Sequence, residues 1–462
     1  LILIIGRRER AFLAYSRHKD RDKFDITTKK VVFLLHIDDL FIKYIVERYP
    51  KNKFFIWKNK ENSFYNQYNN LKIIDENPKM YNFFKKINTS LAARYKNYLV
   101  TRCDALVYIG GSIFIEYDNW KMIKTWWDFM VKKIPVFVLG ANFGPYKDQE
   151  YKVEMNKVFF ECKDVCFRDR YSQGLFENDK VRYAPDILFG YNMPVVKNKE
   201  RKVFVSVIDC NHKNEGINKL SDFTNRYEKF IFKQCQEYIK KGYRIVLSSF
   251  CQSEGDEEAA DRIYQKIIAT YEDEKLVQKI YYDGENQHEI LKQLATSEIV
   301  IATRFHAVVL GLVSQCRVLP VLYSNKTKNI LKDLNINGNM ADIKELDING
   351  VYKTVELNEL EIRKLREKSE KHFEKLDKYI NETSKDIFKR TFWLHNDDTL
   401  HIKIKCDNII EFKNYIDEVN KSREDKIKNS SLVLNPAAKH SISYSEKKRG
   451  SFFLSFSAFP AN

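Results

Sequence analysis

The stretch SEIVIATRFHAVVLGLVSQCRVLPVLYSNK, residues Ser297–Lys326, decides how the second half of the chain folds. Its β-branched run Ile299–Ala302 predicts a short buried strand, and the apolar residues Ala307–Val313 predict the start of a helix. A second β-rich run, Val318–Tyr323, predicts the next strand. A strand, a helix and a strand over roughly 30 residues are typical of a βαβ unit, which places both strands in one parallel sheet.

Two basic side chains, Arg304 and His306, stand between this strand and this helix. Burial without partners would cost free energy. The two side chains are therefore exposed, form a satisfied structural pair, or point at a negatively charged ligand. The first turn of a helix favours anions through its unpaired N–H groups. An arginine fork adds bidentate hydrogen bonds to carboxylate or phosphate. The junction therefore predicts an anion-binding site.

The alternation of short β-type runs with helical patterns extends over most of the chain and predicts an α/β protein with parallel sheets. We expect two Rossmann-like domains, residues 1–191 and 202–350, joined by the polar linker 192–201. A helical extension (351–421), which straps the second domain to the first, and a disordered tail (422–462) follow. The expected strands are Val31–His36, Phe54–Trp57, Leu71–Ile74, Ala105–Ile109, Val136–Gly140 and Val165–Arg168, then Val203–Ile208, Arg244–Phe250, Lys279–Tyr282, Ile299–Thr303 and Val318–Tyr323.

Composition limits the classes of function. A chain of 462 residues is too long for one ordinary core, and 44% hydrophobic residues exclude global disorder. The net charge of +16 is compatible with nucleic acid, an anionic membrane surface or phosphorylated small molecules as partners, and equally with an ordinary solvated surface. None of the eight cysteines forms a C-x-x-C pair, so we interpret them as reduced and the chain as cytosolic. No uncharged apolar run approaches the ~18 residues of a membrane helix, and the opening LILIIGRRER is too short for a signal-peptide core.

Polar and small residues follow several of the predicted strands. Parallel α/β sheets bind ligands at the carboxyl ends of their strands, so these residues are expected to meet at one edge. After the strands come Gly110, Gly111 and Ser112, then Asn142 in GANFGP, then Arg168, Asp169 and Ser172 in RDRYS, then Arg304 and His306, then Lys326 in YSNK. Two arginines, a histidine and a lysine at such junctions favour an anionic substrate over chance exposure.

These motifs resemble those of the polysaccharide pyruvyl transferase family. IGGSIF, PVFVLGANFGP, DVCFRDRYS, RYAPDILF, ATRFHAVVLGL and LYSNK occur in the family's order, from about Asp104 to Leu334. The resemblance implies two Rossmann-like domains whose parallel sheets face a cleft, as in the GT-B glycosyltransferases, with an acceptor-side first domain and a donor-binding second domain. It also implies transfer of a pyruvyl group from phosphoenolpyruvate to sugar hydroxyls, forming a ketal, in cell-surface or extracellular polysaccharide biosynthesis. The chain departs from the family at HIDDLF, where a Gly-rich G-N-x-G-D turn is common.

The same resemblance implies that Arg168, Arg304 and His306 line the phosphoenolpyruvate site. His306 is the expected acid, because imidazole titrates near neutral pH, and Asp186 the expected catalytic carboxylate, with Asp169 as its alternative. By position near the strand ends, further substrate-binding residues are expected at Lys326, Gly110, Gly111, Asn142 and Ser172. No cofactor and no metal are expected.

Two other functions stay open as alternatives. A GT-B-type glycosyltransferase using a sugar nucleotide has the same architecture, although Val308–Lys326 carries no Asp or Glu for donor hydroxyls. A basic nucleic-acid-binding protein is the remote alternative, because Lys and Glu interleave in Glu359–Lys378 as on a solvated surface. The expected partners are phosphoenolpyruvate and a saccharide acceptor, free or lipid-linked, without nucleic acid. The expected location is cytoplasmic, with peripheral contact to an anionic inner membrane face as an open alternative.

Overall fold

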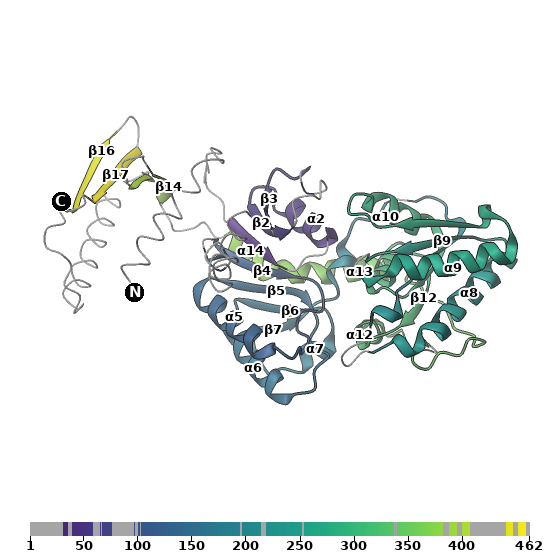
Figure 1. The fold of residues 1–462 in the computed structure, drawn as a ribbon. Helices are drawn as coiled ribbons and strands as arrows, with labels where there is room; N and C mark the ends of the chain where they lie inside the picture. The colour runs from purple at the N-terminus through teal and green to yellow at the C-terminus, as the bar shows by residue number, and fades with distance from the viewer. Residues whose placement is uncertain are drawn as a thin grey trace, which may run out of the picture. The chain divides into compact units, whose positions relative to one another are not determined.

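A computed structural model describes the chain at residues 31–35, 39–58, 65, 67–75, 97, 100–101, 103–194, 196–213, 219–251, 254–336, 338, 340–381, 388–394, 400–406, 440–446 and 451–458. The chain divides into two compact units, of which Lys30–Asn381 is the larger. This unit contains two parallel sheets, whose strands and helices are shown in Figure 1. The predicted α/β class with two parallel sheets is confirmed.

The first sheet has seven parallel strands in the order β3-β2-β1-β4-β5-β6-β7. Every residue of the inner strand VFVLGA is buried, as a strand covered by helices on both faces requires. The strands are β1 (Val31–Leu35), β2 (Lys53–Lys58), β3 (Leu71–Asp75), β4 (Ala105–Ile109), β5 (Val136–Ala141), β6 (Asp164–Phe167) and β7 (Val181–Tyr183). The helices are α2 (Asp39–Arg48), α5 (Trp120–Lys133), α6 (Gln149–Glu161), α7 (Arg170–Gly174) and the 3₁₀ helix η3 (Ile187–Gly190).

The second sheet has six strands in the order β10-β9-β8-β11-β12-β13. The stretch Ser297–Lys326 forms the predicted βαβ unit, because β11 and β12 pair in parallel with Ile301 opposite Leu319. The strands are β8 (Glu200–Ser206), β9 (Arg244–Ser249), β10 (Val277–Tyr281), β11 (Ser297–Ala302), β12 (Arg317–Leu322) and β13 (Ala341–Asp342). The helices are α8 (Thr224–Lys240), α9 (Asp256–Tyr271), α10 (Gln287–Thr296), α11 (Phe305–Val313), α12 (Asn325–Asp333) and the 3₁₀ helices η4 (Cys210–His212), η5 (Ser221–Phe223) and η7 (Glu274–Leu276).

One apolar cluster joins the two sheets. It contains Phe41 of α2, Ile109 of β4 and Ile187 of η3 together with Phe305 and Val309 of α11. Eight of the nine residues of α11 are buried, because this helix is covered by its own sheet on one side and packs against η3 on the other. An apolar helix of this kind fixes the carboxyl edge of the second sheet against that of the first.

The expected strap is present in the helices after the second sheet. These are α13 (Glu359–Ser369), η8 (Glu370–Phe373) and α14 (Glu374–Asn381). Asp377 accepts a hydrogen bond of 2.7 Å from Arg48 of α2, and Arg182 donates to the backbone oxygen of His372 at 2.9 Å. The strap thus binds to the first sheet through buried and half-buried charges.

After residue 381 the structure differs from the sequence-based expectation. Four strands form an antiparallel sheet in the order β14-β15-β17-β16, where a helical extension to 421 and a disordered tail were expected. The physical reason is the alternation of side chains in segments such as HSISYSE, where Ile442 and Tyr444 stand between serines with the period of a strand. The strands are β14 (Phe388–Leu394), β15 (Leu400–Cys406), β16 (His440–Glu446) and β17 (Ser451–Ala458).

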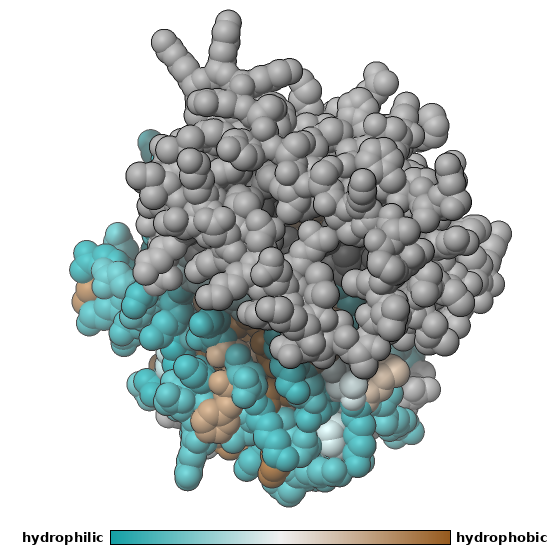
Figure 2. All heavy atoms as spheres, turned by 90° about the vertical axis from the view of Figure 1, so that its left-hand side faces the viewer, coloured by the Kyte–Doolittle hydropathy of each residue, from teal (hydrophilic) through white to brown (hydrophobic). Residues whose placement is uncertain are grey.

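Two observations concern surfaces. No helix among the described residues is long and apolar enough to cross a membrane. The described residues visible in Figure 2 are mostly hydrophilic, with separate apolar areas between them.

Candidate functional site

The two sheets bring their strand ends together at Phe305, the first residue of α11. Arg168 follows β6 in the first sheet, and its guanidinium carbon lies 4.0 Å from the centre of the Phe305 ring. Lys326, which follows β12 in the second sheet, places its Nζ 5.9 Å from the same ring. Cations from both sheets therefore lie close to one aromatic ring, a favourable arrangement for positive groups.

Arg168 is almost completely buried, with 2% of its surface exposed. Its Nη1 lies 3.2 Å from Asp186 Oδ2, and its Nη2 donates to Asn142 Oδ1 at 2.8 Å. The Nε–H group has no hydrogen-bond partner. Asp186 is buried as well, and its other oxygen accepts from the backbone N–H of Leu188 at 2.9 Å. The buried pair therefore leaves the Nε donor of the guanidinium without a partner, although that atom is itself buried.

His306 is the second residue of α11 and is half-buried. Its ring lies edge-on to Phe41 and to Phe305, each at 5.7 Å between centroids. The turn after β4 makes room for Phe41, because a Cβ on Gly110 would lie 2.5 Å from the Phe41 ring and Gly110 has a φ of +77°. This turn therefore fixes the position of Phe41, and Phe41 in turn contacts the His306 ring.

The remaining residues of the first sheet hold the loops together. Gly111 accepts from the backbone N–H of Asn142 at 3.4 Å, and Ser112 donates to the Asn142 side chain at 2.9 Å. Asp169 accepts from the backbone N–H and the hydroxyl of Ser172, at 2.8 and 2.9 Å. Burial raises the pKa of Asp169, while the Ser172 hydrogen bonds and the Arg168 charge lower it. Asp169 and Ser172 are both buried, and the substrate contact expected of Ser172 stays a prediction.

Arg304, the other predicted arginine, is held by two carboxylates that sequence reasoning missed. Asp256 binds it in a bidentate manner, with Nε to Oδ2 at 2.7 Å and Nη2 to Oδ1, and Glu254 accepts from Nη1 at 2.6 Å. Three of its five N–H groups are thereby used. Burial raises the pKa of Asp256, and the Arg304 charge lowers it. Burial also raises the pKa of Glu254, but Arg304 and Lys213 outweigh it and hold the value at about 2.

Tyr323 lies among the cationic side chains at this edge. Its buried ring has Lys326 Nζ at 5.0 Å and Lys213 Nζ at 5.5 Å from its centre. Burial raises the pKa of the phenol, yet Lys326, Arg304 and Lys213 together lower it below its ordinary value. At this hydroxyl the three cations therefore outweigh the effect of burial.

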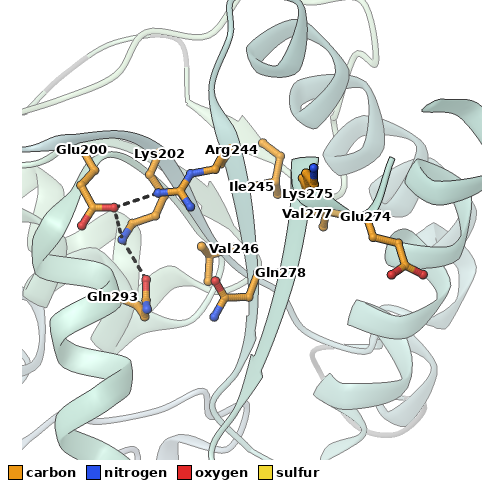
Figure 3. Close-up of a pocket in the computed structure, with 10 residues that line it drawn as sticks. All are labelled: Glu200, Lys202, Arg244, Ile245, Val246, Glu274, Lys275, Val277, Gln278 and Gln293. Carbon is orange, nitrogen blue, oxygen red and sulfur yellow. Dashed lines mark hydrogen bonds and ion pairs between the residues drawn. The ribbon is translucent and has the colours of Figure 1, made fainter. Parts of the chain in front are cut away.

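A separate pocket of about 370 Å³ lies at the opposite, amino edge of the second sheet (Figure 3). Its lining includes the buried Lys202, whose ammonium group donates to Gln293 at 2.8 Å and Thr296 at 2.6 Å. Burial lowers the pKa of Lys202, and Glu200 partly offsets this. Because these residues begin their strands, the pocket is remote from the residues that follow the strand ends. Within the described ranges no group of three His, Cys, Asp or Glu residues is arranged to hold a metal.

The fold and this edge define a two-domain α/β protein in which cationic side chains from two parallel sheets meet at one aromatic ring. The model of the family Polysaccharide pyruvyl transferase matches residues 35–325, which is more than half of the chain. The chain therefore belongs to the polysaccharide pyruvyl transferase family. This match confirms the predicted family.

A curated relative and several solved structures are also similar. The amylovoran biosynthesis protein AmsJ of Erwinia amylovora is 21% identical over 258 residues, which cover 53% of this chain and 62% of that protein. The UDP-GlcNAc 2-epimerase of Methanocaldococcus jannaschii, in complex with UDP-GlcNAc and UDP, is 10% identical with a TM-score of 0.42, covering 72% of this chain and 97% of the other. A putative UDP-N-acetylglucosamine 2-epimerase from Listeria monocytogenes is 10% identical with a TM-score of 0.40, and the match covers 75% of this chain and 97% of the other. Because these TM-scores are below 0.5, we describe the fold from its own strand orders and not from these structures.

Proposed function

We propose that the protein transfers a pyruvyl group from phosphoenolpyruvate to sugar hydroxyls during polysaccharide biosynthesis. The observation that carries this proposal is the position of Arg168 over the ring of Phe305. Phe305 is the residue between Arg304 and His306 in the R-x-H motif. A phosphorylated three-carbon acid needs several cations and one proton donor within a short range, and this junction offers both. Family membership supports the reaction class.

Phosphoenolpyruvate has two anionic ends, and cationic side chains from both sheets lie near the Phe305 ring. Arg168, whose Nε has no hydrogen-bond partner, and the ammonium group of Lys326 both lie close to this ring. Arg304 keeps two N–H groups beyond those used by Asp256 and Glu254. Charge-assisted hydrogen bonds of this kind contribute about 1.5–3 kcal/mol each. We assign the carboxylate and the phosphate of the donor to these groups.

The reaction follows from the chemistry of the donor. His306 donates a proton to the terminal CH₂ carbon, which leaves C2 as an oxocarbenium-like centre. The oxygen of one sugar hydroxyl forms a bond to C2 and loses its proton. The C2–O bond to phosphate then breaks with its electron pair leaving on phosphate, and a second hydroxyl oxygen takes its place. Of the two hydroxyl protons released, one restores His306 and the other leaves with phosphate.

The acceptor and the cellular location are part of the same proposal. A cytoplasmic enzyme acting on a lipid-linked saccharide would work at an anionic membrane face. Apolar side chains are exposed on α5 and α6, namely Met122, Phe129, Val153 and Phe160. Lys121 precedes Met122 and Lys152 precedes Val153 in the sequence, and Lys133 Nζ is 6.0 Å from the Phe129 ring. Flotation with vesicles of acidic and neutral lipids tests this contact, which we expect only with acidic vesicles.

Thermal unfolding with different ligands tests the donor. Phosphoenolpyruvate is expected to raise the Tm of the full chain, because a ligand that binds only the folded state stabilises it. UDP-GlcNAc and UDP-glucose are expected to leave the Tm unchanged. A shift with the sugar nucleotides alone would favour the glycosyltransferase alternative and contradict the proposal.

A further inference from the structure

The hydroxyl proton needs an acceptor, and the predicted carboxylates are poorly placed for this role. Asp186 is buried against Arg168, and Asp169 is buried against Ser172. Glu254 is held at a pKa of about 2 by Arg304 and Lys213, although burial opposes them. A carboxylate this acidic is a weak base near neutral pH. The acceptor of the hydroxyl proton is therefore expected among other side chains at the same edge.

We infer that His212, at the end of η4, is the base that accepts the proton of the attacking sugar hydroxyl, and that Asp209 positions it. His212 follows β8 at the carboxyl edge of the second sheet. Its side chain is 51% exposed, and its Nδ1 lies 3.8 Å from Asp209 Oδ2. This inference rests on the proposed function, because it names the base for that reaction.

Asp209 is suited to orient an imidazole. Its side chain is buried, with one oxygen accepting from the backbone N–H of Asn211 at 2.8 Å. The other oxygen lies 3.1 Å from Arg262 Nη2 of α9 and faces His212. A fixed carboxylate on the Nδ1 side favours the tautomer with the proton on Nδ1. The lone pair of Nε2 is then available for a proton.

The loop between β9 and α9 reserves space for this ring. A Cβ on Gly255 would collide with the His212 imidazole, and Gly255 also has a φ of +72°. The residues on either side of it, Glu254 and Asp256, are the two that hold Arg304. His212 and Arg304 are therefore in contact with one short loop. Residues 254–256 thus connect His212 with the arginine of the R-x-H motif, which belongs to the proposed donor site.

The step balances without a further reactant. Nε2 of His212 takes the hydroxyl proton as the O–H electron pair forms the new bond between oxygen and C2. The imidazolium then returns its proton to the leaving phosphate. His306 supplies the proton that C3 gains, so the two histidines act on opposite ends of the same addition.

Chemical rescue in the full chain tests this role. His212→Ala is expected to lower kcat by at least about 100-fold, the range of general-base catalysis, with the Tm shift by phosphoenolpyruvate unchanged. Added imidazole should restore turnover with saturation, because it replaces the missing base. Asp209→Asn, which keeps the oxygen that caps Asn211, is expected to lower kcat by a smaller factor. His288→Gln, on the exposed face of α10, is the matched control.

Turnover is followed as phosphate released from phosphoenolpyruvate with p-nitrophenyl hexosides that carry free 1,2- or 1,3-diols. Turnover of His212→Ala within threefold of the wild type would overturn the inference. Lost turnover that imidazole does not restore would also overturn it, and would assign His212 a structural role. A wild-type chain that releases no phosphate would overturn the proposed function itself, and this outcome is visible before any variant is made.

Discussion

The guanidinium carbon of Arg168 lies 4.0 Å from the centre of the Phe305 ring, so a side chain of the first sheet rests on the R-x-H motif of the second. The contact lies beside a shared apolar cluster that holds the two sheet edges together. A substrate bound there would contact residues that are more than 130 positions apart in the sequence (168 to 305). The stability and the activity of the chain should both depend on this contact.

Removing Arg168 alone is expected to destabilise the fold. Arg168→Met leaves Asp186 buried without its cation, and breaking a buried pair in this way costs about 3–5 kcal/mol. The double variant Arg168→Met with Asp186→Asn should recover much of that loss, because the buried charge is gone. Urea unfolding of the three proteins measures the difference. Equal stability of the single and double variants would show that Asp186 does not depend on Arg168.

Replacing His306 is expected to separate catalysis from folding. His306→Gln should lower kcat by about 10²–10⁴-fold, the usual contribution of a general acid. Its half-buried position in the first turn of α11 tolerates glutamine, so the Tm should change little. Phosphate release at saturating phosphoenolpyruvate is the measurement. Near wild-type turnover would remove His306 from the acid role.

The turn after β4 gives a test of packing. Gly110→Ala places a Cβ against the Phe41 ring and forces alanine into a left-handed conformation, which itself costs about 1–2 kcal/mol. We expect a lower free energy of unfolding and a displaced Phe41, with a fall in turnover through His306. Gly174→Ala is the matched control, because nothing lies within 4 Å of its Cβ position. Equal effects of the two substitutions would contradict the proposed link from Gly110 to His306.

The strap predicts a pH dependence of stability. His372 is completely buried, and desolvation, with help from Arg182, lowers its pKa to about 3. The unfolded chain takes up a proton on this histidine below about pH 6.5, whereas the folded chain does not. Stability should therefore fall as the pH drops from about 6.5 towards 3, by up to roughly 1.4 kcal/mol per pH unit from this group.

Comparison with His372→Gln isolates that contribution. Glutamine can donate to the Pro185 oxygen, which lies 2.8 Å from His372 Nε2, but it does not titrate. Unfolding by urea at pH 7 and at pH 5 should show a smaller loss of stability for the variant than for the wild type. An identical loss in both proteins would mean that His372 does not titrate on unfolding.

Local pattern was sufficient for the elements that form the site. The run Ser297–Lys326 has the periods of a strand, a helix and a strand, and it folds as β11, α11 and β12. The rule that ligand residues follow parallel strands also placed Arg168 and Lys326 correctly at strand ends, and the structure brings both to Phe305. These features depend on residues that are close in sequence.

The partners of Arg304 were beyond the reach of local pattern. Glu254 and Asp256 lie about 50 positions before it, in a segment whose acids read as the solvated first turn of a helix. Their pairing depends on β9 and β11 lying on either side of β8, which no single window of sequence reveals. The strands after residue 381 escape local pattern for a different reason, because a segment such as His440–Glu446 is polar like an unstructured tail although its apolar residues recur at every second position.

The most direct test of the account is to incubate the full chain with phosphoenolpyruvate labelled with ¹³C at C2 and a p-nitrophenyl hexoside with a free diol. The account predicts a ¹³C signal from a ketal carbon on the sugar, with one phosphate released for each ketal formed. It also predicts that Arg168→Lys, which keeps the charge but loses the guanidinium fork, greatly slows this transfer. Labelled phosphoenolpyruvate that remains unchanged, while a sugar nucleotide is consumed under the same conditions, would contradict it.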